Sequence, residues 1–68
     1  VYPNPFVSEI YIGENNRSVE IYNLNGGLVY GMSQPSSRID VSGLAAGSYI
    51  LIKKDSSGHI SSHKIMKM

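Results

Sequence analysis

Short runs of β-branched and aromatic residues alternate with clusters of turn-forming residues along the whole chain. The turn clusters recur about every 8 to 12 residues, a spacing typical of small all-β folds. No window places apolar residues at helical spacing between a capping residue and a glycine, so we predict no helix longer than one turn. The runs predicted to form strands are residues 9–12, 18–24, 28–32, 38–41, 48–53 and 60–68. We therefore predict an all-β fold, a small antiparallel β-sandwich of six or seven strands.

Turn chemistry predicts two hairpins. Asn25 and Gly26, both of which tolerate a positive φ, lie together between two of the predicted strands. At the second turn, the Asp55 side chain can bond the turn backbone and Gly58 can close the turn. This second hairpin places the strand before Asp55 antiparallel to the last strand.

Alternation within the strands predicts part of the core, because side chains two residues apart on a strand point to the same face. One of Ile10 and Ile12 should be buried together with six other side chains. These six are Val19, Ile21, Ile39, Val41, Tyr49 and Leu51. The last strand is ambiguous, because Ile65 falls on one face and the other apolar residues from position 60 onward fall on the opposite one. A bulge or burial of both faces would reconcile this pattern.

Length and composition restrict the possibilities further. A chain of 68 residues can build one small core, so we expect one domain over residues 1–68. The chain contains no cysteine, which excludes disulfides and thiolate zinc sites. The longest apolar run, residues 49–52, is far too short to cross a bilayer. Because the sequence opens on Val1 and not on an initiator methionine, we expect it to be part of a longer protein.

Charge is distributed unevenly along the chain. Residues 1–52 carry a net charge of −2, whereas residues 53–68, with four lysines and one aspartate, carry +3. Nucleic-acid binding would require more arginine and interleaved aromatic side chains than this segment contains. Lysines along an edge strand are the commoner explanation of such a pattern.

No catalytic or metal-binding constellation is present in the sequence. On a strand, His59 and His63 would stand about 13 Å apart, too far for one ion, and we expect both to be exposed strand histidines. The carboxylates lie on separate strands and turns, and there is no G-x-S-x-G nucleophile elbow or phosphate loop. We therefore expect no enzyme activity, no cofactor and no metal site in this domain.

Two motifs are more informative. Tyr2 is followed by Pro3, Asn4 and Pro5, and the two prolines hold the preceding residues extended, giving either a stiff lead-in at the edge of a sheet or the end of a proline-rich linker. The other motif has Leu44 and Gly47 ahead of Tyr49 at the start of an apolar strand. This arrangement predicts a tyrosine corner, in which the phenol bonds back to upstream backbone near Leu44.

Four blocks together resemble a known family. They are the Pro3-Asn4-Pro5 opening, residues 19–29 around Asn25 and Gly26, residues 44–51 with the Leu44, Gly47 and Tyr49 motif, and residues 63–68. In this order and spacing they resemble the type A C-terminal sorting domain of the type IX (Por) secretion system of Bacteroidota. The resemblance covers essentially the whole chain. It implies an immunoglobulin-like β-sandwich at the C-terminus of a secreted cargo protein.

The resemblance also implies a route and partners. The domain would direct its upstream cargo from the periplasm through the outer-membrane translocon of the type IX system. A sortase-like protease would then remove the domain and anchor the cargo at the cell surface, or the cargo would be released outside the cell. The family's cleavage region precedes the Pro3-Asn4-Pro5 block. No nucleic acid and no stable membrane insertion are expected.

The basic and apolar end of the last strand is the predicted recognition element for the translocon. An apolar strand end flanked by charge can add to a partner's sheet while the charges steer the encounter. The residues concerned are Lys64, Ile65, Met66 and Lys67. Two alternatives remain open: a carbohydrate-binding or adhesion module of a secreted enzyme, which would use solvent-facing tyrosines, and a domain that only stabilises its parent protein.

Overall fold

The protein, as a computed structural model, is described over residues 1–2 and 5–68. This part of the chain forms six strands and no helix. The strands are β1 (Glu9–Tyr11), β2 (Asn16–Asn23), β3 (Leu28–Ser33), β4 (Arg38–Asp40), β5 (Gly47–Asp55) and β6 (Ile60–Lys67). Every run predicted to be a strand forms one, and the ends differ by at most two residues. None of the described residues belongs to a helix long and apolar enough to cross a membrane.

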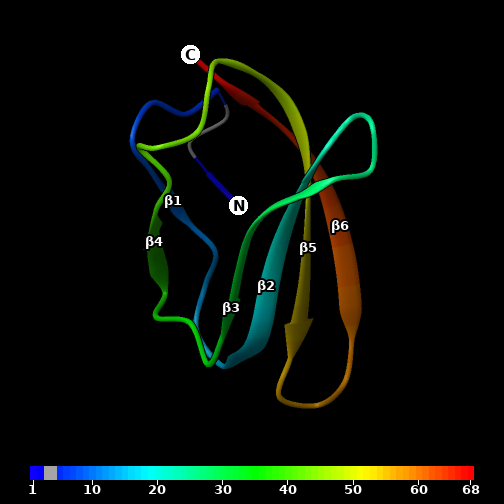
Figure 1. Ribbon diagram of the computed structural model, residues 1–68. Helices are drawn as coiled ribbons and strands as arrows, with labels where there is room; N and C mark the ends of the chain where they lie inside the picture. The colour runs from blue at the N-terminus through cyan, green and yellow to red at the C-terminus, as the bar shows by residue number, and fades with distance from the viewer. Residues whose placement is uncertain (3–4) are drawn as a thin grey trace.

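The strands form two antiparallel sheets that face each other. One sheet has two strands, β1 and β4, and the other has four strands in the order β3-β2-β5-β6. In Figure 1 the small sheet lies on the left and the large sheet on the right, with the core between the two layers. The prediction of a small antiparallel β-sandwich is thereby confirmed.

The core lies between the two sheets and contains every residue predicted for it. The sequence predicted burial of Ile10 or Ile12, and both are buried because they lie two residues apart on the same face. Phe6 and Ile65 are buried in addition. The complete core consists of Phe6, Ile10, Ile12, Val19, Ile21, Ile39, Val41, Tyr49, Leu51 and Ile65.

Pairing with β5 decides which face of the last strand is buried. Ile65 lies opposite Tyr49, whose side chain is in the core, and Ile65 is 1% exposed. The register between β5 and β6 runs without a shift along the whole pair. A bulge is therefore not needed: Ile65 points inward, and Ile60 and Met66 lie exposed on the outer face.

The hairpin between β2 and β3 is present, but its turn differs from the expectation. The N–H of Gly26 donates to the carbonyl of Asn23 at 3.0 Å, which places Leu24 and Asn25 at the centre of the turn. Gly26 has a φ of 88°, whereas Asn25 is not in the positive-φ region. The tolerance of Asn25 for positive φ is therefore not used, because a three-residue loop requires a left-handed residue only at its last position. The second predicted hairpin, around Asp55 and Gly58, is also present.

Candidate functional site

Strand alternation divides the predicted recognition residues at the end of β6. Lys64 and Met66 lie on the outer face, whereas Ile65 is part of the core. Lys67 is half-buried on the inner side, and its ammonium donates to the carbonyl of Met68 at 3.2 Å. The structure thus brings Lys64 and Met66 together, while Ile65 is not accessible to a partner in the folded domain.

The backbone of Phe6 pairs with the end of β6. Its N–H donates to the Met66 carbonyl at 2.9 Å, and its carbonyl accepts from the Met68 N–H at 2.8 Å. These bonds form a short parallel bridge opposite Lys67, and the Phe6 side chain is fully buried. Sequence reasoning missed this residue. The available signal was that the chain's single phenylalanine directly follows Pro5.

A shallow pocket lies beside this bridge. Its volume is about 270 Å³, and its lining includes Pro5, Ser48, Lys64 and Met66. The lead-in at Pro5 and the outer face of β6, which the sequence singled out separately, are therefore neighbours. Pro3 and Asn4, the other residues of the predicted lead-in motif, lie outside the described residues.

The predicted tyrosine corner is present where the chain crosses from β4 in the small sheet to β5 in the large one. The buried Tyr49 donates its hydroxyl to the carbonyl of Ala45 at 2.5 Å. Leu44 packs against the core, and Gly47 begins β5 with a φ of 147°. These residues have a structural role, since they fix the crossing between the two sheets.

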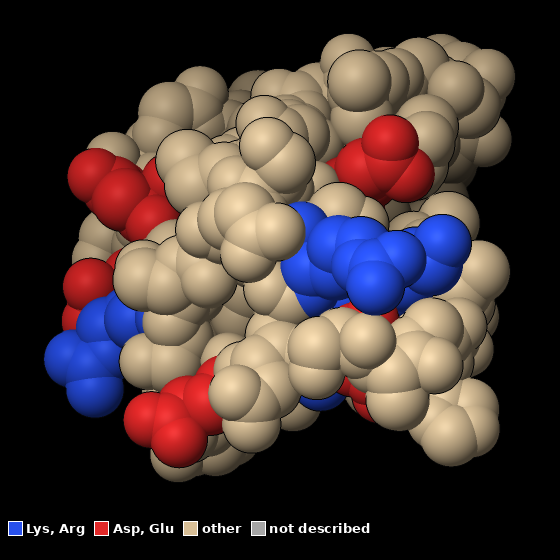
Figure 2. All heavy atoms as spheres, turned by 90° about the horizontal axis from the view of Figure 1, so that it is seen from below, with Lys and Arg blue, Asp and Glu red and all other residues tan. Residues whose placement is uncertain are grey.

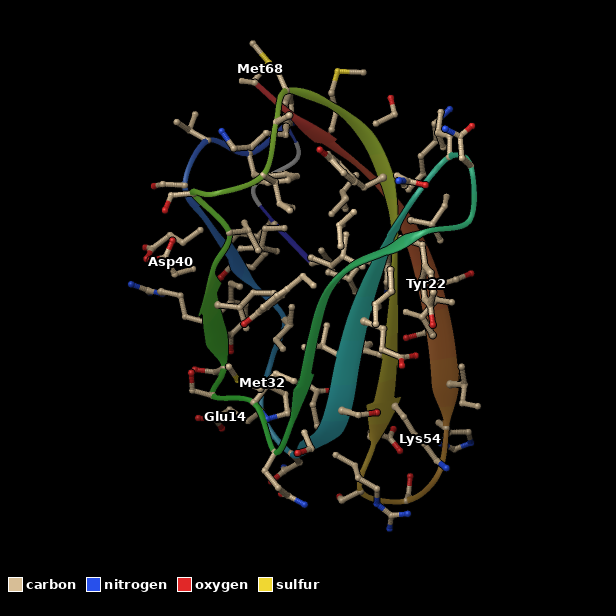
Figure 3. All side chains as sticks on the ribbon, in the orientation of Figure 1. Glu14, Tyr22, Met32, Asp40, Lys54 and Met68 are labelled. Carbon is tan, nitrogen blue, oxygen red and sulfur yellow. The ribbon has the colours of Figure 1, made fainter. Side chains whose placement is uncertain are left out.

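The tyrosines do not form a common ligand-binding platform. The rings of Tyr2 and Tyr11 pack on each other, with centroids 5.1 Å apart and planes inclined by 41°. Tyr22 lies on the opposite side of the molecule, on the face of the large sheet that points away from β1 and β4 (Figure 3). Tyr49 is in the core and Tyr30 packs against it. Carbohydrate binding, which would need several solvent-facing rings on one surface, is not favoured by this placement.

The two histidines differ in environment, which corrects the prediction that both are exposed on a strand. His59 is exposed but precedes β6, and its Nδ1 lies 3.7 Å from an Asp55 carboxylate oxygen. His63 is half-buried, and its buried Nε2 has no hydrogen-bond partner. Burial lowers the pKa of His63 below its usual value, and the nearby charges of the Val1 amine and Lys53 lower it further. The described residues contain no group of three or more metal-ligating side chains.

A second pocket, of about 270 Å³, lies at the end of the sandwich near the turn after β5. Two of its polar side chains are used by the fold: the Lys53 ammonium donates to the carbonyl of Ile12 at 2.9 Å, and the Asn16 amide donates to the same carbonyl at 3.0 Å. Figure 2, seen from this end, shows basic and acidic groups interspersed. This is a solvated surface and not the single-sign patch that nucleic-acid binding would require.

Comparison with known proteins identifies the family. The sequence model for the secretion system C-terminal sorting domain matches residues 1–68. No curated protein and no solved structure matches the chain. A sorting signal is not itself catalytic, and the signal of this family implies export to the cell surface or the extracellular space. The chain belongs to the secretion system C-terminal sorting domain family and is a C-terminal secretion signal of the type IX secretion system.

Proposed function

We propose that the outer-membrane translocon of the type IX system recognises this domain in the periplasm and exports the cargo joined to it. A sortase-like protease then removes the domain and anchors the cargo at the surface. The observation that supports this proposal is the family match over the whole chain. The bonds between Phe6 and β6 add support, because they join the lead-in from the cargo and the basic strand end into one folded unit.

Within this proposal, the accessible groups at the end of β6 make the first contact. Lys64 and Lys67 belong to the segment of net charge +3, so they steer a partner that carries carboxylates. Met66, which is exposed beside them, contributes apolar contact. Ile65 holds the strand in register from the core side and makes no direct contact itself.

A charge-reversal experiment tests this contact. The domain is fused to an unrelated periplasmic reporter in a cell with a type IX system, and the reporter on the cell surface is quantified by protease accessibility. Lys64→Glu combined with Lys67→Glu should reduce surface reporter while the melting temperature of the domain is unchanged.

A matched control carries the same change of charge at the other end of the sheet, in Arg17→Glu with Lys54→Glu. Both variants change the net charge by −4, so a general charge effect would impair them equally. Export of the Lys64 and Lys67 variant at the wild-type level would exclude this strand end as the recognition element. No export of the wild-type fusion would contradict the proposed function itself.

A further inference from the structure

The two edges of the four-stranded sheet are not equivalent. The sheet ends at β6 on one side and at β3 on the other. The outer edge of β6 is occupied at its C-terminal end, where Met66 and Met68 are bonded to Phe6. A partner strand added there would have to displace Phe6, which is fully buried. The edge of β3 has no comparable cover: among the described residues, no backbone hydrogen bond reaches residues 28–33 from outside the sheet.

The register identifies the backbone groups that β3 presents at this edge. The N–H of Gln34 donates to the carbonyl of Arg17 at 2.7 Å, so the backbone of Gln34 faces β2. Successive residues of a strand direct their backbone groups to opposite sides. Gly31 and Ser33 therefore direct their N–H and C=O groups outward, away from β2.

The composition of β3 also differs from that of a protected edge. Natural edge strands are commonly guarded by lysine or proline, and β6 carries Lys64 and Lys67. Residues 28–33 contain neither lysine nor proline and no charged side chain at all. Leu28 and Met32 are about half exposed, at 57% and 48%. The irregularity in pairing lies near the hairpin, between Ile21 and Tyr22 of β2, so residues 30–33 remain regularly paired and available as a template.

We propose that β3 is the strand-addition site of this signal, where an extended, uncharged segment of a type IX component pairs with the edge at Gly31 and Ser33. The inference rests on the proposed function and assigns the pairing to the edge opposite β6. Main-chain hydrogen bonds supply affinity in this recognition mode. An uncharged segment fits because residues 28–33 carry no charged side chain that could pair with a charge on the added strand.

Two serines provide a matched test on the two edges. Ser33 of β3 and Ser62 of β6 are both exposed. The bonds from Phe6 to Met66 and Met68 show that even-numbered residues of β6 direct their backbone outward, so Ser62 does too. Proline at either position removes an outward N–H that the sheet does not use, which edge strands tolerate.

The expected result separates the edges. Ser33→Pro in the reporter fusion should lower surface reporter roughly two- to tenfold, the effect of one lost hydrogen bond. Ser62→Pro should leave export at the wild-type level. Both variants should keep the wild-type melting temperature. If Ser33→Pro unfolds, Gly31→Lys replaces it, because its Cβ would meet only the Leu28 side chain at 3.7 Å and its charge would block an uncharged partner.

Three results would overturn the proposal. Wild-type export of a folded Ser33→Pro or Gly31→Lys variant would exclude β3 as the site. Loss of export in Ser62→Pro alone would assign the pairing to β6. A purified wild-type domain that is dimeric by native mass spectrometry, and monomeric as Ser33→Pro, would show that β3 pairs with a second copy. In each case an exported wild-type fusion shows that the proposed function itself still holds.

Discussion

Asn23 and Asp55 occupy equivalent positions in two turns of the same geometry. In each turn the side-chain oxygen accepts hydrogen bonds from the N–H groups two and four residues further along, at 3.0 and 2.9 Å. A left-handed glycine lies three residues further along, Gly26 with a φ of 88° and Gly58 with a φ of 96°. The two hairpins of the large sheet therefore use one device, once with a neutral amide and once with a carboxylate.

This equivalence predicts a pH dependence at one turn only. Hydrogen bonds from Ser57 and the His59 N–H hold the pKa of Asp55 below its usual value of 3.8. A lowered carboxylate pKa contributes stability that is present above 3.8 and is lost as the pH falls through the folded-state value. Asp55→Asn should keep the turn and reduce the loss of stability between pH 5 and pH 2, as measured by urea unfolding. Asn23→Asp should increase that loss, and an unchanged pH profile in both variants would contradict the prediction.

Phe6 should contribute to stability far more than its position near the chain end suggests. Phe6→Ala removes a fully buried ring and should lower the free energy of unfolding by about 3 to 5 kcal/mol. The neighbouring Val7 is 65% exposed, so Val7→Ala should change the free energy of unfolding by less than about 0.5 kcal/mol. Urea denaturation of both variants measures the difference. Equal stability of the two would show that the Phe6 bridge is not formed in solution.

Tyr49→Phe should isolate the contribution of the tyrosine corner. The substitution keeps the buried ring and leaves the Ala45 carbonyl without its hydroxyl donor, at a cost of about 0.5 to 1.5 kcal/mol. Tyr30→Phe is the control, because the hydroxyl of Tyr30 makes only an exposed 3.9 Å contact with the Met32 sulfur. Thermal unfolding should show a lower melting temperature for Tyr49→Phe alone. A shift of equal size in both variants would rule out a specific role for the corner bond.

His63 should make the domain less stable in weakly acidic solution. Its pKa is lowered from 6.5, chiefly by burial, so the folded state favours the neutral ring. Stability from this residue is complete above pH 6.5 and is lost as the pH falls through 6.5 toward the folded-state pKa. His63→Gln should flatten the change in urea midpoint between pH 8 and pH 5.5. His59→Gln, which leaves His63 in place, should retain the change in urea midpoint. If His59→Gln flattens the change and His63→Gln does not, the pH dependence comes from His59 and the prediction is wrong.

Local sequence features determined the strands, the turns and most of the core. Alternation placed Val19 and Ile21 on the inner face, and it did the same for Tyr49 and Leu51. The period of a strand is a local property, so it can be read without knowing which strands pair. Turn chemistry is also a local property, so it located both hairpins. The length of the loop that contains Asn25 was known only from the structure.

Only the tertiary structure decided the face of the last strand and the state of the sheet edges. Both faces of β6 carry apolar residues, so alternation alone could not choose, and the pairing of Ile65 with Tyr49 made the choice. The burial of Phe6 depends on contact with Met66, which lies sixty residues further along the chain. No local pattern encodes such a contact, because it forms only when the order of strands brings the two ends of the chain together. The same strand order leaves β3 at an edge, although its sequence contains none of the lysines or prolines that commonly protect edge strands.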